Sequence, residues 1–209
     1  MKFSSVVLLF AALLPARAFA EEDACLKMQN AWNAVKTYRC TYRAVTMREG
    51  KVSETIMKYS FEKPGKIRMD IIKPRKGAVL IYNPESSDKV QVRPFPGLPG
   101  FVLNYELTNK RVTSDSGATL DHSDLGHRTE TVCREIEEAY EYKLENPSEI
   151  TLSLKENNRS VKRKFILGET GLLKKIETRD DKGSLLESFE WLDMSVNPEL
   201  DENLFLKFQ

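Results

Sequence analysis

The chain has 209 residues, 41% of them hydrophobic, and this length and composition predict one domain with a substantial core. Its 32 basic and 31 acidic residues give a net charge of +1. This balance argues against nucleic acid as a partner, because neutralising phosphates requires a net basic face.

The N-terminus has the features of a secretory signal peptide. Lys2 supplies a positive start, residues 6–14 are apolar, and Ala18, Phe19 and Ala20 form a small-x-small cleavage site. The apolar run is shorter than the roughly 20 residues that span a bilayer. We therefore expect residues 1–20 to be removed on export and residues 21–209 to form a single domain.

The exported chain is predicted to begin with a helix and to continue mainly as strands. Asp23 is a suitable N-cap, and apolar residues recur at helical spacing over residues 24–38. The period then changes to two, which indicates strands separated by turns rich in Gly, Pro and Asn. The predicted strands cover residues 39–48, 52–61, 66–73, 78–82, 89–93, 150–155, 161–167, 172–180 and 185–192, and a second helix covers residues 129–142.

The segment PFPGLPGF, residues 94–101, interrupts this pattern. Its prolines and glycines prevent regular structure, yet Phe95, Leu98 and Phe101 are too apolar for an ordinary solvated loop. Two arrangements are equally compatible with this composition. The loop either folds down on the core or lies over the mouth of a hollow.

Three cysteines, Cys25, Cys40 and Cys133, allow one disulfide and one free thiol in an oxidising compartment. Cys25 and Cys40 lie near opposite ends of the first predicted helix, roughly 20 Å apart, whereas a disulfide needs Cα atoms within about 7 Å. Cys40–Cys133 is therefore the preferred pair, with Cys25–Cys133 as the alternative. No C-x-x-C motif supports a zinc or thioredoxin-like role.

The predicted fold is mainly β (α+β), with about nine antiparallel strands and two helices. A twisted sheet of that width tends to curl. Two helices of about four turns cover only part of its inner face, so the remainder is either filled by side chains or left as an apolar hollow. A large apolar surface open to water usually marks a binding site.

The sequence offers little support for catalysis. It has no G-x-S-x-G elbow and no phosphate-binding glycine loop. His122 and His127 fall in a polar, turn-rich segment that is more typical of a solvated loop than of a metal site. Strand carboxylates such as Glu54 and Glu190 are more typical of ion-paired outer faces than of an acid–base pair. We expect no enzyme activity, no metal and no cofactor.

Two long stretches resemble the periplasmic outer-membrane lipoprotein carrier family, which has the LolA-like fold. They are KPGKIRMDIIKP, residues 63–74, and LGETGLLKKIETRDDKGSLLESFEWLDMSVNPELDENLF, residues 167–205. The closing VNPELDENLFLKF is the most specific piece, while YRCTYRAVTMREGKV resembles a group of secreted relatives. The resemblance covers nearly the whole exported chain outside residues 94–146, and it is to the superfamily rather than to the carrier itself.

The resemblance implies an unclosed antiparallel β-barrel with a helical lid, whose hollow holds acyl chains of a lipoprotein or lipid. In the family a basic residue before the turn proline, usually arginine, points inward and helps latch the lid. Lys63 occupies this position, and its ammonium lacks the planar fork of arginine. By strand parity from Lys63, the hollow would be lined by Met57, Tyr59, Phe61, Ile67, Met69 and Ile71. The lid would comprise Lys63, Phe95, Leu98, Phe101, Leu103, Val132, Ile136 and Tyr140.

The resemblance also implies a monomeric carrier in the periplasm of a Gram-negative bacterium. Its partners would be acyl chains and membrane-bound donor and acceptor proteins. A second hypothesis is an envelope sensor that reads out lipoprotein through the same hollow and binds a regulator elsewhere. A third, a small-molecule enzyme on a related half-barrel, would require a turnover that depends on His122 or Glu190.

Overall fold

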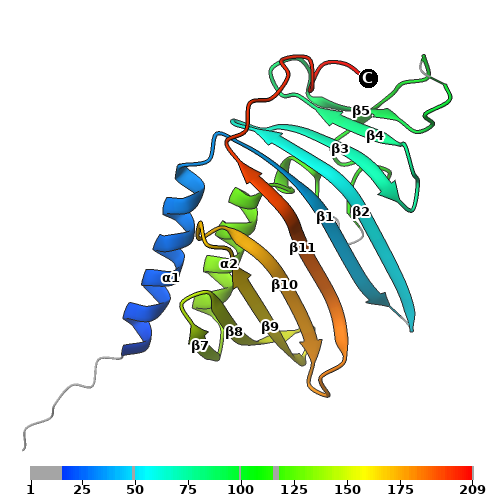
Figure 1. Ribbon diagram of the computed structural model, residues 1–209. Helices are drawn as coiled ribbons and strands as arrows, with labels where there is room; N and C mark the ends of the chain where they lie inside the picture. The colour runs from blue at the N-terminus through cyan, green and yellow to red at the C-terminus, as the bar shows by residue number, and fades with distance from the viewer. Residues whose placement is uncertain (1–15, 49, 99, 115–117, 209) are drawn as a thin grey trace, which may run out of the picture.

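The computed structural model describes residues 16–48, 50–98, 100–114 and 118–208, and the apolar run of the expected signal peptide lies outside these ranges. Within them, eleven strands form one antiparallel sheet in the order β6-β5-β4-β3-β2-β1-β11-β10-β9-β8-β7. The sheet is curved but not closed, and two helices lie on one side of it (Figure 1). The predicted fold class, a mainly β unclosed antiparallel half-barrel, is confirmed.

The strands are short at the edges and long at the centre of the sheet. Their bounds are β1 (Thr37–Arg48), β2 (Lys51–Glu62), β3 (Lys66–Lys73), β4 (Val79–Tyr82), β5 (Lys89–Arg93), β6 (Leu103–Glu106), β7 (Glu141–Asn146), β8 (Glu149–Glu156), β9 (Arg159–Leu167), β10 (Leu173–Asp180) and β11 (Leu185–Val196). The central pair, β1 and β11, joins the two ends of the chain, with Tyr42 opposite Trp191. This long-range pairing makes one sheet of the N-terminal and C-terminal hairpins.

Two edge strands, β6 and β7, were missing from the sequence prediction. In β6 the half-buried Leu103 and Tyr105 alternate with exposed neighbours, and the strand pairs with β5. β7 is mostly exposed and rich in charge, and its residues fall within or just after the predicted second helix. Edge strands with polar sequences give a weak period-two signal, because only one side of the strand is paired and little of it is buried.

Both helices are displaced from their predicted bounds. Helix α1 (Ala16–Asn33) begins before Asp23, so this residue is not the N-cap, and it ends before Tyr38, which lies in β1 and is fully buried. Helix α2 (Leu125–Glu138) begins four residues early because the Asp124 carboxylate accepts hydrogen bonds from the backbone N–H of Gly126 and His127, at 2.6 and 3.2 Å. Such a cap satisfies N–H groups that the first turn leaves unpaired.

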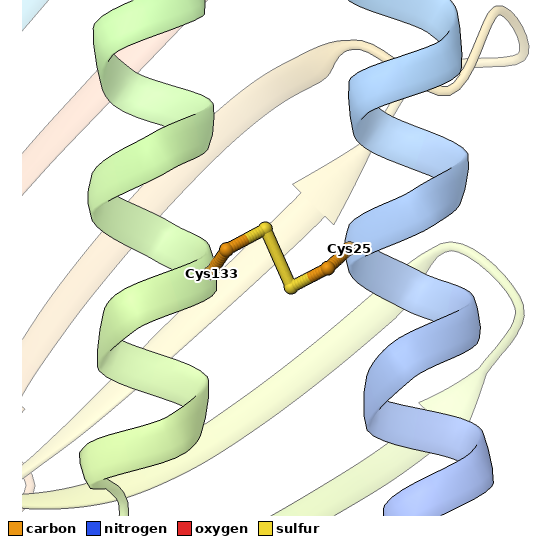
Figure 2. Close-up of a disulfide and its surroundings, with 2 residues drawn as sticks. All are labelled: Cys25 and Cys133. Carbon is orange, nitrogen blue, oxygen red and sulfur yellow. A yellow bond between two sulfur atoms is a disulfide. The ribbon is translucent and has the colours of Figure 1, made fainter.

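The two helices are joined by a disulfide between Cys25 and Cys133, whose Cα atoms are 5.5 Å apart (Figure 2). The preferred prediction, Cys40–Cys133, is therefore wrong, and the alternative pair is the observed one. Cys40 lies on β1 and is a buried free thiol. The prediction failed because it assigned no position to the first helix, which packs along α2 with Cys25 facing Cys133.

The closing segment of the chain folds back over the outer face of the sheet. Leu204 and Phe205 are buried against Val79 and Ile81 of β4. The buried guanidinium of Arg68 holds this segment by donating to the carbonyl oxygens of Leu204 and Lys207, at 3.0 and 2.9 Å. A second, smaller core thus lies behind β3 and β4, on the side opposite the helices.

Candidate functional site

A cavity of about 380 Å³ opens on the concave side of the sheet. Its walls come from β1 to β5 and from β11, and residues 111–114, 118–120 and 123 form the opposite side. Helix α2 packs against β8, so the β7–β10 half of the sheet is covered by the helix layer. The other half is covered by an irregular segment, and the cavity lies beneath it.

Four of the six residues predicted to line a hollow do so: Met57, Tyr59, Met69 and Ile71. They belong to two neighbouring strands, with Met57 opposite Ile71 and Tyr59 opposite Met69. Side chains opposite one another in an antiparallel pair lie on one face, and this pairing gives the cavity a continuous apolar floor.

Phe61 and Ile67 lie on the same face of the sheet as the floor residues, but they are outside the cavity. Both are fully buried, and they face each other across β2 and β3. The Phe61 ring centroid lies 5.4 Å from Trp32 and 5.2 Å from Tyr38. Helix α1 therefore covers this end of the two strands, and the prediction that these two residues line the hollow is corrected to core packing.

Several lining residues were not predicted. Tyr42 and Ala44 project from β1, Leu80 from β4 and Phe189 from β11. Tyr42 pairs with Met57, so extending strand parity from β2 to its neighbours would have found it. The sequence prediction followed parity through a single hairpin, and the strand order that brings β11 beside β1 has no local signal.

The cover of the cavity differs from the predicted lid. Val112 and Leu120 are buried and line the cavity. Phe95, Leu98 and Phe101 are exposed by 55, 55 and 45% and are not among the lining residues. The half-buried Leu103 lies on the edge strand β6 and is also outside the lining.

The exposed apolar loop nevertheless lies beside the cavity mouth. Pro96 packs over Gly77, so closely that a Cβ there would lie 2.7 Å from Pro96 Cγ, and Gly77 has a positive φ of 86°. Gly77 ends the β3–β4 turn, which carries Pro74 and Arg75 of the cavity lining. The loop is therefore a neighbour of the mouth rather than its cover.

Helix α2 contributes a different residue from those predicted. Val132 and Ile136 are buried in the main core, and Tyr140 follows the helix and is 53% exposed. Arg128 is the α2 residue that lines the cavity, with its guanidinium carbon 5.3 Å from the Phe189 ring. The helix side of the cavity is therefore cationic where an apolar contact was predicted.

Lys63 contacts the end of helix α1. Its ammonium donates to the carbonyl oxygen of Trp32 at 2.8 Å and to that of Asn33 at 3.4 Å, and it lies 4.6 Å from the Trp32 ring. A cation at a helix C-terminus compensates the unpaired carbonyls. Desolvation lowers the pKa of Lys63, and the nearby Asp124 carboxylate opposes this effect. The lysine thus fastens α1 to the β2–β3 turn.

The polar groups at the inner end of the cavity are satisfied internally. Ser123 donates to the carbonyl oxygen of Leu120 at 2.5 Å, which leaves its oxygen to accept from the Tyr59 hydroxyl at 2.9 Å. Burial raises the pKa of Tyr59 far above its ordinary value. Burial also raises the pKa of Tyr42 to about 12, against an opposing effect of Arg128. Both phenols are neutral at physiological pH.

The two histidines and the carboxylates of Glu54 and Glu190 lie outside the cavity lining. His127 Nδ1 lies 2.6 Å from the Asp124 carboxylate. The exposed His122 packs against His127, with ring centroids 4.5 Å apart. Glu54 and Glu190 form ion pairs with Arg43. Within the described ranges, no group of three or more metal-ligating side chains occurs.

No protein-family model matches the chain, and no curated protein is significantly similar to it. Among solved structures, an uncharacterised conserved protein from Thermus thermophilus matches with a TM-score of 0.50 and 9% identity, over 90% of this chain and 93% of that one. The LolA superfamily protein NE2245 from Nitrosomonas europaea matches with a TM-score of 0.44 and 10% identity, over 90 and 97% of the two chains. A chain of the Pseudomonas aeruginosa MucA/MucB complex matches with a TM-score of 0.44 and 16% identity, over 91% of this chain and 61% of that one.

The match to the Thermus thermophilus structure concerns the fold alone. The architecture described above has the features that the sequence resemblance to the LolA-like fold implied: an unclosed antiparallel sheet with helices on its concave side. The disulfide is typical of exported proteins. Of the described helices, none is long and apolar enough to cross a membrane.

Proposed function

We propose that this protein is an exported, monomeric carrier that holds the acyl chains of a lipoprotein or lipid in the cavity and moves them across the periplasm of a Gram-negative bacterium. The observation that carries the proposal is the cavity of about 380 Å³ with its apolar floor. Ligand sites in proteins commonly occupy roughly 300–1,000 Å³ and are lined mainly by apolar side chains. A cavity near the lower end of that range suits a single acyl chain.

Burial of a chain in this cavity needs no catalytic group. Each methylene removed from water contributes about 0.8 kcal/mol, so a long acyl chain is held by its contact with Met57, Met69 and Ile71 and their neighbours. Release requires an acceptor that buries the chain equally well. Membrane-bound donor and acceptor proteins are the partners that such a cycle needs.

The cover of the cavity is the part that would open. Residues 111–114 and 118–120 line the cavity and belong to an irregular segment that ends in a short 3-10 turn. They are not part of the sheet, and their backbone hydrogen bonds are local, such as Val112 N–H to the Asn109 carbonyl oxygen, so opening them would break no strand pairing but would expose the buried Val112 and Leu120. The apolar loop that carries Phe95 and Leu98 lies beside the mouth and would be the first surface that a departing chain meets.

The matched substitutions Ile71→Glu and Ile72→Glu test the proposal. Ile71 lines the cavity, whereas its neighbour Ile72 is 41% exposed and lies outside the lining. We expect Ile71→Glu to weaken binding of a fluorescent long-chain acyl probe by about tenfold or more, because a charged and hydrated side chain would replace part of the apolar floor that the acyl chain contacts. Ile72→Glu should bind the probe as the wild type does.

Circular dichroism and thermal melts of both variants separate loss of binding from loss of fold. Equal probe affinity in the wild type and in folded Ile71→Glu would contradict the proposal. So would recovery from the envelope of a stoichiometric protein partner with no lipid, which is the behaviour expected of a sensor.

A further inference from the structure

The charge of the cavity lining is strongly one-sided. Among the described lining residues, three are arginines, Arg75, Arg111 and Arg128, and one is acidic, Glu187. Glu187 is already engaged, since its carboxylate accepts from Arg163 at 3.4 Å and from the Thr178 hydroxyl at 3.1 Å. The cavity, whose remaining described lining residues are apolar or uncharged polar, therefore presents three cations to its contents and no free carboxylate.

None of the three arginines has an ion-pair partner in the part of the chain that the structure describes. Arg111 donates from one nitrogen to the Tyr105 hydroxyl at 2.8 Å, and its guanidinium carbon lies 5.7 Å from that ring. Arg128 lies over Phe189. Arg75 belongs to the exposed β3–β4 turn. Aromatic contacts hold Arg111 and Arg128 in place, and Arg128 also attracts the Glu135 carboxylate from a distance without forming an ion pair with it.

The arginines and the apolar floor occupy different depths. Met57, Tyr59 and Met69 are at most 8% exposed, whereas Arg75 and Arg111 are exposed and Arg128 is half-buried. The cavity is therefore apolar at its inner end and cationic toward solvent. This arrangement complements a molecule with an apolar chain and a negatively charged head.

We propose that the ligand of this cavity is an anionic amphiphile, with its carboxylate or phosphate head held by Arg75, Arg111 and Arg128 and its chain on the floor formed by Met57, Tyr59 and Met69. This inference rests on the proposed function and narrows its ligand class. Guanidinium groups suit such heads because their planar fork donates two parallel hydrogen bonds to carboxylate or phosphate.

Three lipids with a common chain length, together with inorganic phosphate, distinguish the possible ligands. Palmitate carries a carboxylate head, palmitoyl lysophosphatidic acid a phosphate head and monopalmitoylglycerol a neutral head, while inorganic phosphate has the head without the chain. We expect the two anionic lipids to bind the wild-type protein at least about tenfold more tightly than the neutral lipid, since a hydrogen bond to a charged group is worth about one order of magnitude in affinity. Inorganic phosphate alone should bind far more weakly than either.

The double variant Arg75→Gln/Arg111→Gln removes two exposed cations and leaves the core intact. It should lose about tenfold or more in affinity for the anionic lipids and retain the affinity for monopalmitoylglycerol within about twofold. Arg159→Gln is the matched control, because Arg159 is an exposed arginine outside the lining. It should bind all four probes as the wild type does.

The outcomes separate this inference from the proposed function. Equal affinity of the wild type for neutral and anionic lipids would contradict the proposal of an anionic head group, but it would not contradict the proposed acyl-chain carrier. If inorganic phosphate bound as tightly as the lipids, the proposal that the ligand is an amphiphile would be wrong. Failure of all three lipids to bind would overturn both proposals.

Discussion

Cys40 lies where the register of β1 against β11 shifts, between Arg39 and Thr41, and its side chain is only 4% exposed. Burial raises the pKa of its thiol to about 12, with a smaller opposing effect of Lys58. A thiol that is buried and protonated is a poor nucleophile, because the thiolate is the reactive form. Cys40 is therefore a core residue rather than a redox or acylation site.

This environment predicts that Cys40 resists alkylation. Iodoacetamide at pH 8.5 should leave the folded protein unmodified over the time in which a urea-unfolded sample takes up one label per chain, counted by mass spectrometry. Because the thiol pKa is raised from 9.0 to about 12, the unfolded chain releases its proton first, and the contribution of Cys40 to stability should fall as pH rises from 9 to 12. Equal labelling of folded and unfolded protein would contradict this assignment.

Helices α1 and α2 are held together by more than their disulfide. Trp32 lies against Gly126 at the start of α2, where a Cβ would overlap the indole ring. Lys63 binds the carbonyl oxygens at the end of α1. These contacts fix the first helix to the second and to the β2–β3 turn, so one end of the concave face is permanently covered.

Removal of the disulfide should weaken this helix layer. The double variant Cys25→Ser/Cys133→Ser is expected to lose about 2–4 kcal/mol in the free energy of unfolding, measured by urea titration, because the cross-link restricts the unfolded chain. Cys40→Ala keeps the disulfide and should remain as sensitive to dithiothreitol as the wild type. If dithiothreitol destabilised the wild type but not Cys40→Ala, the Cys25–Cys133 pairing would be wrong.

Sequence patterns predicted the central strands better than the helix layer. A strand with one buried and one solvated face, such as β9, gives a clear period of two. Helix bounds depend on capping, and both Asp23 and Asp124 can cap a helix, but only Asp124 does so. The disulfide was mispredicted for a similar reason. The choice between Cys25 and Cys40 as the partner of Cys133 depends on the position of α1, which no local sequence pattern specifies.

At the scale of the whole molecule, the helices and the irregular segment divide the concave face between them. Helix α2 packs against β8 in the β7–β10 half, and residues 111–114, 118–120 and 123 lie opposite β1 to β5 with the cavity between them. The sequence predicted a surplus of inner wall and four residues of the cavity floor. It did not predict the cover or the three arginines, because these come from segments that only the strand order brings together.

The most direct test of acyl-chain binding is native mass spectrometry of the protein, purified without detergent, before and after extraction with organic solvent. We expect an adduct with the mass of an acyl lipid that extraction removes, and we expect this adduct to be absent from Ile71→Glu and present on Ile72→Glu. A protein that carries no lipid, and that takes up none when offered anionic or neutral acyl lipids, would contradict the account.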